Sequence, residues 1–162
     1  MIQCTIESLE EKIDACAFTG HREIGEDFCI EELNKAIDEC IKRGCQIFYT
    51  GMAKGFDLIA AKEIVKRKKA GVNVRLYACI PYEKQSKSYS DEDKKLYEEI
   101  LQNADEKKVF FEEYTKWCMM TRNQFMADRA DVLIAFLKKE KGGTYQTVKY
   151  FIKKKKGYVF YV

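Results

Sequence analysis

Short apolar runs alternate with amphipathic helical stripes from residue 14 onward, and this alternation constrains the fold more than any other feature. A helical stripe repeats its apolar residues every three or four positions, whereas a buried strand is a short continuous apolar run. Val132–Leu137 is the most apolar of the expected strands. Continuous apolar strands between helices are typical of a parallel sheet covered on both faces. We therefore expect an α/β, Rossmann-like three-layer fold with a mostly parallel sheet and helices on both faces.

The expected strands and helices follow one another along the chain, and glycine or a helix cap marks several of their ends. Ser90 with Asp93 forms an approximate capping box at the start of one helix. The expected strands cover residues 14–19, 46–49, 73–80, 108–111, 132–137 and 157–162, and the expected helices cover residues 27–43, 56–69, 90–101, 114–129 and about 143 onward. The chain has 162 residues and no repeat or linker, so we expect one domain over residues 1–162, with a loosely ordered N-terminal segment at residues 1–12.

Charge, hydropathy and cysteine content argue against several classes of protein. The 29 Lys and Arg residues against 26 Asp and Glu residues give a net charge of +3, and this weak charge argues against nucleic acid as a partner. No apolar run reaches the roughly 18 residues that span a bilayer, and no signal-peptide pattern is present. The seven cysteines form no CxxC pair and no metal-ligand spacing, which is typical of reduced thiols. We expect a cytoplasmic protein with no metal, no required cofactor and no membrane partner, and we leave open a homo-oligomer.

The first of three glycine-bearing loops is Thr19-Gly20-His21-Arg22, which follows the first expected strand. In an open parallel sheet, ligands bind beyond the carboxyl ends of the strands, so such loops are the first candidates for a site. Gly20 allows close backbone approach to a ligand, and Arg22 can bind a phosphate through two hydrogen bonds. His21 is the only histidine of the chain. The alternative is a strand-end turn with a solvent-facing arginine.

The second loop, which contains Gly51, Met52, Ala53 and Gly55, opens the second expected helix. Backbone N–H groups and the helix dipole at such a position favour an anion, although the loop matches neither the Walker A pattern nor GxGxxG. Asp57, in the first turn of the helix, is expected to cap it or to accept a hydrogen bond from a ribose hydroxyl. The alternative is a tight turn in which glycine relieves strain.

The third loop, Gly142-Gly143-Thr144, follows the most apolar strand and opens the last helix. It offers the same backbone N–H groups to an anion, and Thr144 adds a hydroxyl. We expect the phosphates of a nucleotide to rest on the second and third loops, with arginine side chains as counter-charges.

Several motifs, in order and spacing, resemble the YpsA-like proteins. The motifs are TGHR, GMAKGFD, and MMTRNQFMADRADVLIAF followed by KGGT, and the resemblance extends from about Asp14 to the C-terminus. These proteins belong to the SLOG superfamily, which groups the Smf/DprA DNA-processing proteins with the LOG phosphoribohydrolases. The resemblance implies a Rossmann-like sheet and a nucleotide-derived ligand such as ADP-ribose or an NAD-related molecule. It also adds Arg122 and Asn123 to the expected binding residues, because they match the M-x-x-R-K-x-x-M helix of LOG enzymes.

The sequence departs from the LOG pattern at one position that matters for catalysis. The LOG loop P-G-G-x-G-T-x-x-E ends in a catalytic glutamate, and that position falls here on Thr147 or Lys149. Neither side chain can stabilise a ribosyl cation as a carboxylate does. Our leading hypothesis is therefore a nucleotide-binding protein with a sensing or regulatory role.

Two other functions stay open from the sequence. The first is a nucleotide-processing enzyme that cleaves an N-glycosidic bond or transfers a nucleotide fragment, for which Asp57, Glu112 and Glu113 are the candidate acids. The second is a single-stranded DNA-binding module like DprA.

Overall fold

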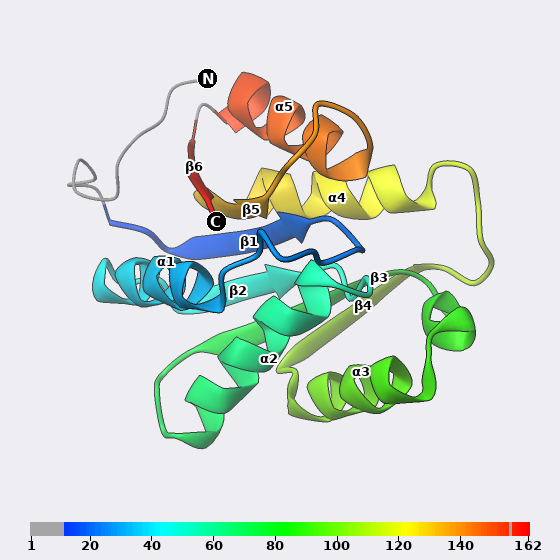
Figure 1. Ribbon diagram of the computed structural model, residues 1–162, viewed down its shortest axis with the longest axis horizontal. Coiled ribbons are helices and arrows are strands. Elements are labelled where there is room, and N and C mark those ends of the chain that lie inside the picture. The colour runs from blue at the N-terminus through cyan, green and yellow to red at the C-terminus, as the bar shows by residue number, and fades with distance from the viewer. Residues whose placement is uncertain (1–11, 156) are drawn as a thin grey trace.

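The computed structural model describes residues 12–155 and 157–162, which form one six-stranded parallel sheet with helices on both faces (Figure 1). This finding confirms the expected Rossmann-like α/β fold. Residues 1–11 of the expected N-terminal segment lie outside the described residues. The strands are β1 (Ala15–Gly20), β2 (Ile47–Thr50), β3 (Arg75–Tyr82), β4 (Glu106–Phe111), β5 (Val132–Phe136) and β6 (Tyr158–Tyr161). The helices are α1 (Ile30–Lys42), α2 (Phe56–Lys69), α3 (Asp91–Asn103), α4 (Cys118–Arg129) and α5 (Gly143–Lys155), with a short 3-10 helix, η2 (Gln85–Ser88).

Each expected strand and helix is present, and the differences lie at their ends. The side chain of Ser90 accepts a hydrogen bond from the backbone N–H of Asp93 at the start of α3, as the capping box predicts. β3 continues through Pro81 to Tyr82, two residues beyond the expected end at Ile80. The strand tolerates this proline because pairing between β2 and β3 ends at Ala78, so β2 requires no N–H group from position 81.

The order of the strands, β4-β3-β2-β1-β5-β6, places β5 beside β1 on the side opposite β2. Successive strands from β1 to β4 therefore add to one side of β1, and β5 and β6 add to its other side. Helices α1, α2 and α3 cover one face of the sheet, whereas α4 and α5 cover the other (Figure 1). The loops after β1 and β5 diverge to opposite faces, and this divergence creates the crevice in which folds of this kind bind ligands.

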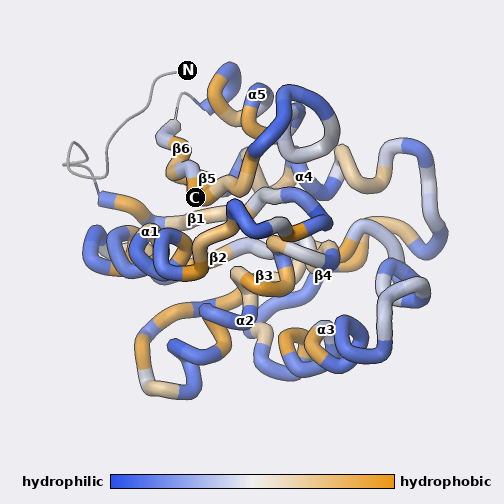
Figure 2. The backbone as a smooth tube through the Cα atoms, viewed as in Figure 1, coloured by the Kyte–Doolittle hydropathy of each residue, from blue (hydrophilic) through white to orange (hydrophobic). Residues whose placement is uncertain are grey.

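Two apolar clusters, one on each face, hold the three layers together. Figure 2 shows hydrophobic residues gathered in the central strands and hydrophilic residues along the outer turns of the helices. On the face of α1, α2 and α3, the buried ring of Phe18 stacks on Phe48 and meets the edge of Phe56, with ring centroids 5.8 and 6.3 Å apart. On the other face, Met126 of α4 and Phe151 of α5 are buried against the sheet. These clusters fix the strand ends from which the candidate site is built.

No helix among residues 12–155 and 157–162 has the length and hydropathy needed to cross a membrane. The expected cytoplasmic location stays a prediction.

Candidate ligand-binding site

A cleft of about 700 Å³ opens at the carboxyl ends of β1 and β5. It lies where the direction of sheet building reverses, which is the position at which open α/β sheets bind ligands. The loop after β1 forms one wall, the loop after β5 and the start of α5 form another, and residues of α2 and α4 complete the lining. The lining residues are Phe18, Thr19, Gly20, His21, Arg22, Glu23, Ile24, Gly25, Asp27, Ala53, Asp57, Met119, Arg122, Asn123, Phe136, Lys138, Lys139, Gly143 and Thr144.

The structure brings most of the sequence-predicted binding residues together in this cleft. Those that line it are Thr19, Gly20, His21, Arg22, Ala53, Asp57, Arg122, Asn123, Gly143 and Thr144, whereas Gly51, Met52, Gly55 and Gly142 do not line it. Among the three candidate acids, Asp57 lines the cleft, while Glu112 and Glu113 are exposed on the loop after β4 and lie outside the lining.

The turn between β2 and α2 differs from the expected phosphate cradle, because three of its N–H groups, those of Met52, Ala53 and Phe56, bind protein atoms. The N–H group of Met52 donates to the hydroxyl of Thr50 at 3.3 Å, and that of Ala53 donates to Oδ2 of Asp57 at 3.3 Å. The N–H group of Phe56 donates to the carbonyl of His21 at 3.2 Å. The carboxylate of Asp57 thus takes the place of an external anion at this turn.

Gly51 and Gly55 shape the site without lining it. Gly55 has a φ of +82°, and a Cβ atom there would lie 2.2 Å from the carbonyl oxygen of Arg22. A Cβ atom at Gly51 would lie 2.8 Å from both the guanidinium of Arg122 and Oδ2 of Asp57. Both glycines are therefore required for close packing. Gly55 allows the loop after β1 to approach, and Gly51 leaves room for the side chains of Arg122 and Asp57.

Arg122 is only 4% exposed, and its guanidinium links the end of β2 to the middle of β3. Nη1 donates to the carbonyl of Gly51, just beyond β2, and to the carbonyl of Cys79 in β3 at 3.4 Å. Nε donates to Oδ1 of Asn123 at 2.7 Å. Arg122 therefore supplies positive charge at the floor of the cleft while it organises the strand ends, a role that the family motif does not predict.

Among the carboxylates of the described residues, Asp57 on the cleft floor is the one with a strongly shifted pKa. Burial disfavours its charged form and raises its pKa from 3.8 to about 6, against the opposing effects of Arg122, the Ala53 N–H group and Arg22. Its Oδ2 atom accepts the N–H of Ala53, while Oδ1 is buried with no hydrogen-bond partner among the described residues. Asp57 is therefore the one sequence-predicted acid placed to donate or accept a proton in the cleft.

His21 joins the two walls of the cleft. Its Nε2 atom accepts a hydrogen bond from the backbone N–H of Lys138 at 2.9 Å, so Nδ1 carries the proton in this arrangement. Burial and the nearby charge of Lys139 lower the pKa of His21, which favours the neutral ring. The ring also meets the edge of Phe136 at a centroid distance of 5.7 Å.

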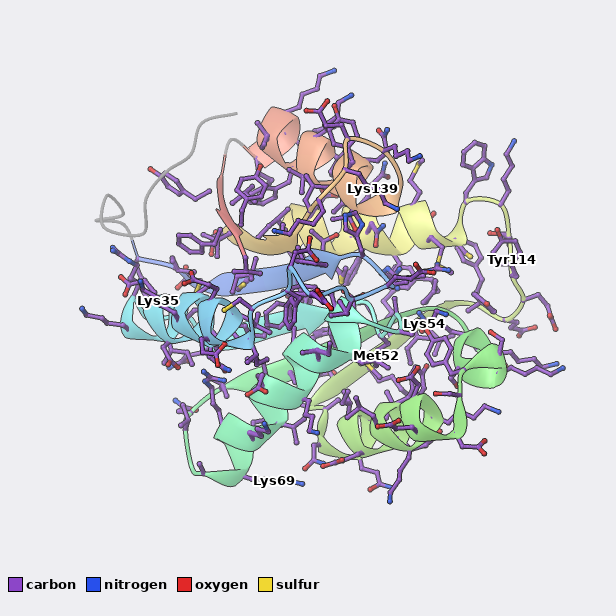
Figure 3. The ribbon with its side chains drawn as sticks, viewed as in Figure 1. Lys35, Met52, Lys54, Lys69, Tyr114 and Lys139 are labelled. Carbon is purple, nitrogen blue, oxygen red and sulfur yellow. The ribbon has the colours of Figure 1, made fainter. Side chains whose placement is uncertain are left out.

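Two lysines of the cleft, Lys138 and Lys139, were missed by the sequence reasoning. They lie two and three residues after the end of β5, and Lys139 lies on the side of the molecule where the strands end (Figure 3). Their position after the most apolar strand is the signal that could have found them, because residues after a central parallel strand face the ligand. The start of α5 lies beside them, where the first helical N–H groups lack intrahelical acceptors and favour an anion.

The positions that match the LOG glutamate perform other tasks. The hydroxyl of Thr147 donates to the carbonyl of Gly143 at 2.8 Å, and the ammonium of Lys149 lies 5.1 Å from the ring centroid of Tyr145. Across residues 12–155 and 157–162, no cluster of three or more His, Cys, Asp or Glu side chains could hold a metal ion.

The fold is that of a Rossmann-like domain, and the candidate site lies in the crevice between β1 and β5. The model of the YpsA family, described as the YspA SLOG family, matches residues 16–161, so the chain belongs to this family. This membership confirms the resemblance that the motifs indicate. No curated protein matches the sequence significantly.

Two solved structures of DNA processing protein A share the fold. The protein from Streptococcus pneumoniae matches with a TM-score of 0.67 and 20% identity, over 91% of this chain and 50% of the other. The protein from Helicobacter pylori, described by its single-stranded DNA binding mode, matches with a TM-score of 0.60 and 20% identity, over 91% of this chain and 64% of the other. This chain thus spans about half to two thirds of the length of these relatives.

The expectation that nucleic acid is an unlikely partner is wrong. It rested on the net charge of +3, yet the structural neighbours are DNA-processing proteins. Net charge averages over the whole chain, whereas binding to a polyanion depends on where cations gather on the surface.

Proposed function

We propose that the protein binds a phosphate-bearing nucleotide, of the ADP-ribose or NAD type, in the β1/β5 cleft and has a sensing or regulatory role. The observation that carries this proposal is the convergence of Arg22, Lys138 and Lys139 with the start of α5 in one cleft. Cations and free helical N–H groups are the two features that proteins use to bind phosphate.

The arrangement favours binding over LOG-type hydrolysis. The cleft has a buried acid in Asp57, but the position of the LOG glutamate holds Thr147 or Lys149. A phosphate would rest on the α5 side of the cleft, since at the head of α2 the N–H groups of Ala53 and Phe56 already bind Asp57 and His21. Regulation by a bound nucleotide requires that the cleft bind the nucleotide, and it does not require the protein to cleave it.

The double variant Lys138→Glu/Lys139→Glu is expected to weaken nucleotide binding at least about tenfold, because two attractive charges become repulsive. The measurement is a thermal-shift titration with ADP-ribose, NAD and AMP, in which saturating ligand raises the stability of the wild type. Lys141→Glu is the matched control, because Lys141 is exposed in the same loop and does not line the cleft. Chromatography of the same mixtures detects any free base and so separates binding from N-glycosidic cleavage. The proposal fails if none of the three ligands stabilises the wild type at millimolar concentration.

A second candidate function is single-stranded DNA binding, which the described activity of the Helicobacter pylori neighbour favours. The cations at the mouth of the cleft would then contact phosphates of the strand. Fluorescence anisotropy of a labelled oligo-dT is expected to show binding that weakens steeply between about 50 and 200 mM salt, because phosphate contacts release counterions. The same double lysine variant should reduce the salt slope. Absence of any anisotropy change at low salt would exclude this function.

A further inference from the structure

A second hollow, of about 580 Å³, lies between α4 and α5. The two helices pack side by side on one face of the sheet (Figure 1). We call this hollow the α4–α5 groove, and define its near end by Met119, Met120, Asn123, Gly143 and Gln146. Met120 is 46% exposed, so its side chain is accessible to a molecule in the groove.

The α4–α5 groove is continuous with the cleft. Met119, Asn123 and Gly143 line both hollows, so their shared boundary lies at the first turns of α4 and α5. A Cβ atom at Gly143 would meet no atom within 4 Å, so the boundary is open at this residue. A molecule bound at the start of α5 therefore lies directly beside the groove.

The two hollows differ in chemistry. The cleft carries Arg22, Lys138 and Lys139, whereas the near end of the groove offers two methionine side chains and two carboxamides. Methionine sulfur contacts aromatic rings favourably, and carboxamides present both donors and acceptors. Oδ1 of Asn123 accepts from Nε of Arg122, which leaves its NH₂ group to donate elsewhere.

We propose that the near end of the α4–α5 groove is the subsite for the heteroaromatic base of the nucleotide. This inference rests on the proposed function, because the phosphate of the same molecule occupies the cleft. The base packs against Met119 and Met120, and Asn123 and Gln146 form hydrogen bonds with its edge. Continuity with the cationic cleft favours a nucleotide over a protein segment, since a helix docked along the groove would make no use of the charges at its open end.

The test compares AMP with ribose 5-phosphate, which lacks the base, by calorimetric titration of the wild type. We expect AMP to bind about tenfold more tightly, because the base adds apolar contact and hydrogen bonds. Met120→Ser and Gln146→Ala should each weaken AMP binding several-fold, up to about tenfold, and leave ribose 5-phosphate binding unchanged. Val72→Ser is the matched control, because Val72 is an exposed apolar residue, at 37%, outside the groove.

The outcomes separate the two proposals. If AMP and ribose 5-phosphate bind equally and the groove variants change neither, the phosphate site stands and the base subsite is overturned. If neither molecule binds, the base subsite falls, and the proposed function falls with it when ADP-ribose and NAD also fail to stabilise the wild type. Sedimentation of the wild type and of Met120→Ser gives an independent readout: a dimer of the wild type that Met120→Ser loses without loss of base preference would assign the groove to a second copy of the chain and overturn the inference.

Discussion

Gly55→Ala is expected to lower the free energy of unfolding by about 4 kcal/mol. A φ of +82° strains any residue with a Cβ atom, and that atom would lie 2.2 Å from the carbonyl oxygen of Arg22. The contact is with backbone, which cannot rotate away as the end of a side chain can. Either the loop after β1 or the start of α2 must therefore move, and both border the cleft.

Gly71→Ala separates the two causes of this loss. Gly71 has a nearly identical φ of +85°, but a Cβ atom there would meet nothing within 4 Å. We expect it to lower the free energy of unfolding by only about 1 kcal/mol, which is the effect of backbone strain alone. Urea unfolding of both variants measures the difference, and equal losses would show that the approach of Arg22 to Gly55 has no energetic consequence.

Arg122→Met is expected to lower the free energy of unfolding by about 3 to 5 kcal/mol near neutral pH. The change removes hydrogen bonds to the carbonyls of Gly51 and Cys79 and leaves Asp57 buried without its strongest compensating charge. Arg129→Met, at the exposed end of the same helix, is the control and should lose less than about 1 kcal/mol. Urea unfolding again provides the measurement.

The loss of stability in Arg122→Met should depend on pH, because removal of the guanidinium changes the pKa of Asp57. In the wild type this pKa is about 6 in the folded state, above the ordinary value of 3.8, so the folded state binds more protons between these values. Stability therefore falls as pH rises through this window, by about 3 kcal/mol in total. Removal of Arg122 raises the pKa of Asp57 further and extends the fall to higher pH. The difference between variant and wild type should thus be smallest near about pH 5 and larger at about pH 8, and a constant difference would contradict this account.

The succession of strands and helices could be predicted from the sequence because it depends on local patterns. The span of α2, Phe56–Lys69, matches the apolar stripe and its flanking glycines at both ends. The start of α1 at Ile30 was harder to predict, because Asp27 and Phe28 belong to the loop that borders the cleft rather than to the helix.

The internal use of the α2 N–H groups could not be predicted in the same way. A glycine-bearing turn before a helix predicts an anion site, but whether that anion is a ligand or the side chain of Asp57 depends on three-dimensional packing. The position of Arg122 over the end of β2 and the middle of β3 likewise depends on long-range contacts. Gly51 lies 71 positions before Arg122 in the chain, and Cys79 lies 43 positions before it. The place of Lys138 and Lys139 in the cleft could have been predicted from the sequence, because residues that follow a central parallel strand lie at the ligand-binding edge of the sheet.

The carboxylate of Asp57 has a consequence for which molecules the crevice accepts. A second phosphate group that reached toward the head of α2 would meet a like charge instead of free amides whenever Asp57 is ionised. Above about pH 6 the crevice should therefore bind a ligand in one orientation. The anionic end of the ligand would point toward α5, and an uncharged, hydroxyl-rich portion would point toward α2. Acidification would relax this preference by neutralising the one group that enforces it.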